Sequence, residues 1–221
     1  MIRLEDLNLI NLKIYQDDQL YCFTSDAVLL SRFASVKKGD VVADFCSGSG
    51  IVGLHLYGLN PDLIKSVTLF ELQQPLYDLS VKSIEYNGLQ DKFTAVRTDL
   101  TELDKEYYGK FSLVVCNPPY TKPKDGAFAE NPSIAVCKTE IKLDLKSLVN
   151  SISRALKYGG RTCLVYRADR IAELIYTLKE HGLEPKIIQP VSARDKDPYL
   201  VLVQAVKGGN PGVKFLKTII N

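Results

Sequence analysis

The sequence predicts an α/β protein with a doubly wound, mostly parallel sheet. Two observations support this fold: short apolar runs rich in β-branched residues alternate along the chain with segments whose apolar residues recur at helical spacing. Runs that are apolar throughout are typical of parallel strands, which are buried on both faces. The chain has 221 residues, of which 46% are hydrophobic and 24% charged, and this composition excludes disordered and collagen-like classes.

The elements follow from these patterns in chain order. Asn87-Gly88 and Tyr158-Gly159-Gly160 are typical signals for the C-terminus of a helix. No helical pattern separates the last two strands, so we expect these strands to form a C-terminal antiparallel hairpin joined by residues 192–198. The expected sheet has seven strands, at 41–45, 66–70, 93–97, 111–116, 162–166, 185–191 and 199–206, with helices at 50–57, 74–86, 143–156 and 170–181.

Charge is distributed unevenly along the chain, although the net charge is only +2. Residues 1–116 carry 11 Lys/Arg against 16 Asp/Glu, a net charge of −5, whereas residues 117–221 carry 17 against 10, a net charge of +7. A basic half suits a phosphate-rich partner, although an ordinary solvated face produces the same pattern. The basic half begins with residues 120–140, whose apolar residues follow neither the period of a strand nor that of a helix. A connection of this length is usually functional or mobile.

Composition also excludes several kinds of site. The two histidines are too few for a histidine metal site, and no run approaches the roughly 20 apolar residues of a membrane span. The N-terminus lacks the basic patch of a signal peptide, so a cytoplasmic enzyme is expected. No metal is expected, because the five cysteines are far apart and form no C-x-x-C pair: Cys22, Cys46, Cys116, Cys137 and Cys163.

A glycine-rich turn follows the first predicted strand, where residues 44–50 read Asp44-Phe45-Cys46-Ser47-Gly48-Ser49-Gly50. Glycines at such a turn allow the backbone to approach a ligand closely, although a strained turn alone would also explain them. Glu71, 21 residues beyond Gly50, is placed to accept hydrogen bonds from ribose hydroxyls, and Asp99 follows the third strand. Gly53 completes a G-x-G-x-x-G pattern, so the glycines do not distinguish NAD from other nucleotides.

A second motif, Asn117-Pro118-Pro119-Tyr120, directly follows the fourth predicted strand. Its two prolines make the strand exit rigid and extended. The Asn117 side chain and the Pro118 carbonyl can accept the two protons of an exocyclic amine, while Tyr120 stacks on the ring that carries it. These bonds would draw the amine nitrogen toward tetrahedral geometry and stabilise the positive charge that develops on it. The motif therefore predicts a ring amine as nucleophile, without a conventional general base; a merely structural turn is the alternative.

The glycine-rich turn, the two acids and the Asn-Pro-Pro-Tyr motif, in this order along the chain, resemble the motifs of class I S-adenosylmethionine-dependent methyltransferases that methylate amines. Residues 23–30, 166–170 and 201–213 are similar to the bacterial tRNA(Val) (adenine-37-N6)-methyltransferase family, and the likeness extends over nearly the whole chain. The resemblance implies a Rossmann-like class I methyltransferase fold. It also implies transfer of a methyl group from S-adenosyl-L-methionine to N6 of an adenine in tRNA, A37 of the anticodon loop of tRNA(Val).

The resemblance further implies a single methyltransferase domain over 1–221, in which an N-terminal extension over 1–38 forms part of the cofactor pocket. Glu71 would bind the cofactor ribose and Asp99 its adenine amine. The residues expected to bind the cofactor are Phe23, Thr24, Ser25, Asp26, Asp44, Cys46, Gly48, Gly50, Glu71, Asp99 and Asn117. Those expected to hold the target base are Asn117, Pro118, Pro119 and Tyr120, and the candidates for RNA phosphate contacts are Lys122, Lys124, Lys138, Arg167 and Arg170.

The chain departs from the family pattern at two places. Family members usually have glycine where Cys46 stands, and Arg-His-Glu where this chain has Lys138-Thr139-Glu140. The first departure concerns the shape of the glycine-rich turn. The second lies in the region expected to touch RNA.

Other functions stay open as alternatives. Enzymes that methylate a glutamine of release factors share the Asn-Pro-Pro-Tyr motif, but they normally carry a substantial helical domain before the cofactor motif, and only 43 residues precede Asp44 here. DNA adenine methyltransferases usually need a target-recognition domain. A nicotinamide dehydrogenase would leave residues 117–120 unexplained. A non-catalytic RNA-binding descendant of the fold would be expected to lose the cofactor acids or the motif, and both are intact.

Overall fold

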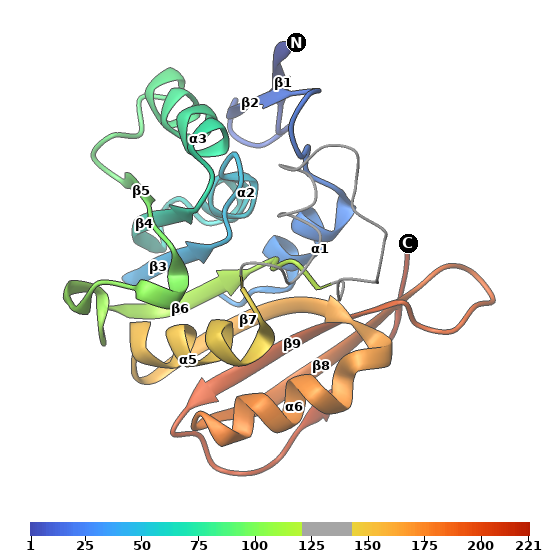
Figure 1. Ribbon diagram of the computed structural model, residues 1–221. Helices are drawn as coiled ribbons and strands as arrows, with labels where there is room; N and C mark the ends of the chain where they lie inside the picture. Colours follow the sequence, from blue (N-terminus) through green and yellow to red (C-terminus); the bar gives the residue numbers. More distant parts are fainter. Residues whose placement is uncertain (121–142) are drawn as a thin grey trace, which may run out of the picture.

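The computed structural model describes residues 1–120 and 143–221, and a mixed sheet of nine strands forms its centre (Figure 1). The strand order is β10-β8-β9-β7-β6-β3-β4-β5, and β11 also pairs with β8. The strands are β3 (Asp40–Phe45), β4 (Ile64–Glu71), β5 (Phe93–Arg97), β6 (Phe111–Cys116), β7 (Leu156–Arg167), β8 (Leu183–Ser192), β9 (Leu200–Lys207), β10 (Lys214–Phe215) and β11 (Ile219–Ile220).

The five neighbouring strands β5, β4, β3, β6 and β7 run parallel to one another. Strand β9 lies between β7 and β8 and runs antiparallel to both. The predicted C-terminal hairpin is therefore confirmed as β8 and β9. The sheet has nine strands rather than the expected seven, because β10 and β11 add to the free edge of β8. Each has only two residues, too short for the apolar runs that identify strands in a sequence.

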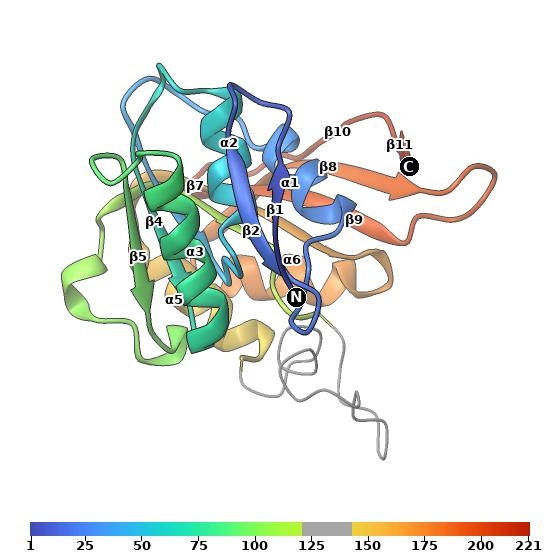
Figure 2. The same ribbon diagram turned by 90° about the horizontal axis from the view of Figure 1, so that it is seen from above.

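Helices cover both faces of the sheet, as expected for a doubly wound fold (Figure 2). One face carries α1 (Ser25–Phe33), α2 (Ile51–Leu59) and α3 (Gln74–Tyr86), and the other carries α5 (Leu145–Ala155) and α6 (Ile171–Glu180). Side chains of β6 alternate between two cores: Leu113 and Val115 pack on the α1–α2 side, and Val114 on the α5–α6 side. The described residues also form three short 3-10 turns: η1 (Leu100–Glu102), η2 (Lys105–Tyr107) and η3 (Ala168–Arg170).

The Tyr158-Gly159-Gly160 signal was misassigned to the end of a helix. Helix α5 ends at Ala155, and β7 begins at the next residue. Leu156 pairs with Phe111 while Arg161 pairs with Leu113, so the residues between them form an irregularity inside the strand. Gly159 has a φ of 74°, a left-handed conformation that favours glycine in a bulge as much as at a helix end.

The N-terminal residues form a separate two-stranded sheet of β1 (Ile2–Asp6) and β2 (Lys13–Asp17). Strand β2 is tied to α3 through Asn87, whose side-chain oxygen accepts a bond from Lys13 N at 2.9 Å and whose amide donates to Lys13 O at 2.7 Å. Asn87 also caps α3 as its sequence predicted. Tyr21 and Phe23, which follow β2, lie near the carboxyl ends of the central strands.

Candidate active site

A cavity lies at the carboxyl ends of β3, β4 and β6, where parallel α/β sheets bind their ligands. Strand β3 leads into α2 on one face of the sheet, whereas α5, the next helix that the structure describes after β6, lies on the other face, so the helices change sides here. Seven residues singled out from the sequence line this cavity together: Phe23, Cys46, Gly48, Glu71, Asp99, Asn117 and Pro119. The structure therefore brings the glycine-rich turn, both acids and part of the Asn-Pro-Pro-Tyr motif to one place.

The turn between β3 and α2 is left-handed at three positions: Cys46 (φ 57°), Gly48 (φ 57°) and Gly50 (φ 94°). Cys46 thus occupies a conformation that costs a residue with a side chain roughly 1–2 kcal/mol, which explains why glycine is usual there. Gly53 has a different role, because a Cβ atom on it would lie 2.5 Å from Cδ2 of Leu69. It allows α2 to pack closely on β4 and need not mark a dinucleotide site.

Glu71 joins the two loops that border the cavity. Its Oε2 accepts a hydrogen bond from Gly48 N at 2.9 Å, and its Oε1 accepts one from Gln73 N at 2.8 Å. The residue is only 7% exposed, and this burial raises the pKa of its carboxyl against the opposing effect of these bonds. Each carboxylate oxygen can accept a second bond, so Glu71 can also receive hydroxyl donors from a ligand.

Asp99 lies after β5 and caps η1. Its Oδ1 accepts hydrogen bonds from N and Oγ1 of Thr101, at 2.8 and 2.7 Å. Both bonds reach the same oxygen, so among the described residues Oδ2 is available to accept a ligand amine. The capping bonds also orient the carboxyl group toward the cavity that it lines.

Asp44 lies behind the turn and is fully buried. Its Oδ2 accepts a bond from Gly53 N at 2.8 Å, whereas Oδ1 and the buried hydroxyl of Ser47 have no hydrogen-bond partner within the described chain. Burial raises the pKa of Asp44 to about 8, and the nearby Glu71 acts in the same direction. Unpartnered buried polar atoms are uncommon in proteins, and the Ser47 hydroxyl, whose residue lines the cavity, is one that a ligand can satisfy.

The Asn-Pro-Pro-Tyr motif leaves β6 beside the end of β3, since Cys116 pairs with Phe45. Asn117 and Pro119 line the cavity, and Tyr120 lies beyond it. The Tyr120 hydroxyl donates to Asp26 Oδ2 at 2.9 Å, and its carbonyl accepts a bond from Arg170 Nη1 at 3.0 Å. Burial, and next the charge of Asp26, raise the pKa of Tyr120, so this hydroxyl keeps the proton that it donates.

Several predicted site residues do not line this cavity. Thr24 and Ser25 are exposed at the start of α1, and Asp26 contacts Tyr120 rather than the cavity wall. Arg170 makes two bonds of 2.9 Å to Glu173, and its side chain is only 11% exposed. The cavity wall also lacks Gly50, the fully buried Asp44, Pro118 and Arg167, and Arg167 is paired with Asp169. Three further candidates lie outside the described residues: Lys122, Lys124 and Lys138.

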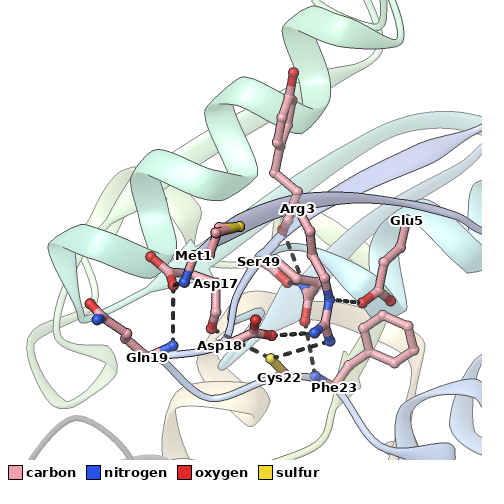
Figure 3. Close-up of polar contacts among 11 residues, drawn as sticks. Met1, Arg3, Glu5, Asp17, Asp18, Gln19, Cys22, Phe23 and Ser49 are labelled. Atoms are coloured by element: carbon pink, nitrogen blue, oxygen red, sulfur yellow. Dashed lines mark hydrogen bonds and ion pairs between the residues drawn. The ribbon is translucent and has the colours of Figure 1, made fainter.

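The N-terminal segment contributes residues that sequence reasoning missed. Tyr21 lines the cavity beside Phe23, and buried Gln16 bonds both the Ser49 hydroxyl and, at 3.1 Å, the backbone N–H of Phe23. Figure 3 shows Arg3, which pairs with Glu5 and Asp18 and contacts Cys22, the residue before Phe23. The bond between Gln16 and Ser49 joins residues that are 33 positions apart, so no local sequence pattern could have indicated it.

Two further findings concern residues 1–120 and 143–221. None of their helices has the length and apolar character required to cross a bilayer. They also contain no group of three or more His, Cys, Asp or Glu side chains placed to hold a metal ion.

Comparisons with known proteins agree with this architecture. A tRNA1(Val) (adenine(37)-N6)-methyltransferase of Photobacterium profundum is 23% identical, over 79% of this chain and 72% of that protein. A release factor glutamine methyltransferase of Clostridium botulinum is 26% identical, over 70% of this chain and 57% of that protein. The crystal structure of a predicted O-methyltransferase from Agrobacterium tumefaciens superposes with a TM-score of 0.69 at 20% identity, covering 88% and 86% of the two chains.

These matches confirm the class I methyltransferase fold expected from the motifs. The crystal structure of TYW2 from M. jannaschii in complex with AdoMet shares the fold as well, with a TM-score of 0.63 at 12% identity over 93% of this chain and 85% of that chain. The family model for the methyltransferase small domain matches residues 24–181. The chain belongs to the methyltransferase small domain family.

Proposed function

We propose that this protein transfers a methyl group from S-adenosylmethionine to N6 of an adenine in tRNA, namely A37 in the anticodon loop of tRNA(Val). The observation that carries the proposal is the position of Asn117 and Pro119, which line one cavity with Glu71 and Asp99. Several relatives named tRNA1(Val) (adenine(37)-N6)-methyltransferase support the substrate. A tRNA substrate also implies that the protein acts in the cytoplasm.

The residues of the cavity suit S-adenosylmethionine. Glu71 has acceptor capacity for a ribose diol, and Asp99 Oδ2 for an adenine amine. The unpartnered Ser47 hydroxyl and the backbone of the left-handed turn lie where the methionine end would be held. When bound, S-adenosylmethionine supplies an electrophilic methyl group on its sulfonium.

The motif then acts on the substrate amine. The side-chain oxygen of Asn117 and the carbonyl of Pro118 accept hydrogen bonds from its two N–H groups, which localises the lone pair on the nitrogen and stabilises the positive charge that develops there. Once the bond from nitrogen to the methyl carbon has formed and the bond from that carbon to sulfur has broken, the nitrogen releases one proton to solvent. Tyr120 supplies the stacking face, and its own protonated hydroxyl is bonded to Asp26. Positioning supplies most of the acceleration, because the displacement needs no covalent enzyme intermediate. A base in an anticodon loop is unpaired, so moving it into the site costs less than extrusion from a duplex.

A protein glutamine is the second candidate substrate, because its side-chain amide offers the same two N–H protons to Asn117 and Pro118. The similarity to the release factor enzyme of C. botulinum favours this candidate, although the match covers only 57% of that protein. The assay below distinguishes the two candidate substrates.

The test uses purified protein, methyl-labelled S-adenosylmethionine and a tRNA(Val) transcript with adenine at position 37. We expect label in N6-methyladenosine after digestion to nucleosides, and none with a matched transcript that carries guanine at position 37. A release factor and an adenine-containing DNA duplex serve as competing substrates. Label in the release factor, with none in either RNA, would refute the tRNA proposal while leaving the methyltransferase assignment intact.

A further inference from the structure

A second cavity adjoins the Asn-Pro-Pro-Tyr motif and has a volume of about 390 Å³, within the range of small-molecule sites. The two cavities share no lining residue, but at two places consecutive residues line one cavity each. Pro119 lines the first cavity and Tyr120 the second, and Ala27 lines the first and Asp26 the second. The other residues of the second cavity are Arg167, Asp169, Pro198, Tyr199 and Leu200.

Tyr120 is held firmly in the wall of this cavity. Asp26 of α1 accepts the bond from its hydroxyl at 2.9 Å, and Arg170 of η3 donates to its carbonyl at 3.0 Å. Arg170 is itself fixed by Glu173 and lies over the ring of Tyr166, 5.0 Å from the centroid. The ring and the backbone of Tyr120 are therefore anchored to two different elements that are distant in sequence.

Tyr199 supplies a second aromatic side chain to the same cavity. It is 44% exposed, so part of the ring is accessible to a ligand. Its backbone N–H donates to Val191 O at 3.0 Å, its carbonyl accepts a bond from Ala168 N at 3.1 Å, and its hydroxyl accepts one from Asn221 Nδ2 at 2.9 Å. A half-exposed ring held at both ends can serve as a stacking surface with little loss of conformational entropy on binding.

The charges of the cavity favour a base over a phosphate. Among the described residues that line it, Arg167 bonds both carboxylate oxygens of Asp169, so these two charges offset each other and the carboxylate of Asp26 leaves the lining with a net negative charge. Carboxylates accept bonds from the amino and imino groups of a nucleobase but repel phosphate oxygens. Two tyrosines and the carboxylate of Asp26 therefore suit an unpaired base that bears N–H donors.

We propose that the second cavity is the subsite through which the substrate nucleoside enters, with Tyr199 as a stacking wall in addition to Tyr120, and with Asp26 as the positioning residue that sets the Tyr120 ring. The inference rests on the proposed function. It gives Asp26, at the start of α1, a role toward the substrate rather than toward the cofactor. It also makes Arg170 part of the support of the motif rather than a contact to RNA phosphate.

The first experiment tests Tyr199 with the tRNA(Val) transcript as the probe. Because stacking of one base contributes about 1–3 kcal/mol, Tyr199→Ala should raise KM for the RNA about 5- to 150-fold. Tyr199→Phe keeps the ring and should return KM to within a few-fold of wild type. The affinity for S-adenosylmethionine, measured by calorimetry, should be unchanged in both variants, which also shows that they are folded. Tyr176→Ala is the matched control, since Tyr176 is 65% exposed on α6 and lines neither cavity.

The second experiment tests Asp26 through a double-mutant cycle. Asp26→Leu and Tyr120→Phe remove the same hydrogen bond, so the double variant should lose little more kcat/KM than the more damaging single variant. Asp26→Asn keeps an acceptor for the Tyr120 hydroxyl and should retain most of the activity. Fully additive losses would refute the positioning role.

The outcomes separate the two proposals. If the wild-type protein methylates RNA and Tyr199→Ala leaves KM unchanged, the subsite is refuted and the proposed function stands. If the wild-type protein binds S-adenosylmethionine and methylates no RNA, the proposed function is refuted and the nucleoside subsite with it.

Discussion

The buried carboxyl of Asp44 predicts a specific dependence of stability on pH in the ligand-free protein. Its pKa is about 8 in the folded state, against 3.8 for the unperturbed group, because the side chain is fully buried. Between these values the unfolded chain has released the proton while the folded chain still holds it. Unfolding then releases a proton, so the contribution of Asp44 to stability is complete below about pH 4 and declines as pH rises toward 8.

The magnitude follows from the same shift. Each pH unit between the two pKa values lowers the free energy of unfolding by about 1.4 kcal/mol, which amounts to a change on the order of 5 kcal/mol across the whole interval. Asp44→Asn removes this titration and keeps an amide oxygen that can accept the bond from Gly53 N. The stability of the variant relative to wild type should therefore increase steadily from pH 5 to pH 8 and level off above it.

Urea denaturation at pH 5, 6, 7, 8 and 9, at constant ionic strength, measures this difference. The burial of Glu71 also raises its pKa, but Glu71 is present in both proteins and largely cancels in the comparison. Asp62→Asn is the control for the loss of one carboxylate, because Asp62 is exposed. A difference between wild type and Asp44→Asn that is the same at every pH would show that Asp44 is ionised in the folded protein and would refute the reasoning.

Three further predictions follow from the site. Gly53→Ala should lower the free energy of unfolding by about 1–3 kcal/mol, because its Cβ would lie 2.5 Å from Leu69 Cδ2; an unchanged urea midpoint would contradict the close packing. Asp99→Ala should weaken S-adenosylmethionine binding by about 1–3 kcal/mol in calorimetry, with exposed Asp91→Ala as control; equal affinities would place the adenine contact elsewhere. Asn117→Ala should reduce turnover at least about 100-fold and leave cofactor affinity unchanged; activity within a few-fold of wild type would remove Asn117 from the reaction.

Much of the fold could be read from local patterns. The strand at 111–116 is apolar at five of its six positions and buried throughout, as a central parallel strand requires, and the hydroxyl of the one polar residue, Ser112, donates to Asp40 Oδ1 at 2.7 Å. The helix predicted at 74–86 has the same bounds in the structure, because its apolar spacing and the Asn87-Gly88 signal agree. The N-terminal hairpin and α1 were not predicted, since their burial comes from packing on α3 and α2 rather than from a strong pattern of their own.

The candidate site divides in the same way. The glycine-rich turn, Glu71, Asp99 and Asn117 could be found because each directly follows an apolar strand, and the carboxyl ends of neighbouring parallel strands meet at one edge. The class of reaction then came from the resemblance of these motifs to methyltransferases that act on amines. The sequence could not show that Asp26 bonds Tyr120, 94 residues away, or that Arg170 supports the Tyr120 carbonyl. Those contacts depend on how α1 and η3 pack against the strand ends, and hydrogen bonds between distant segments leave no periodic signal in a chain.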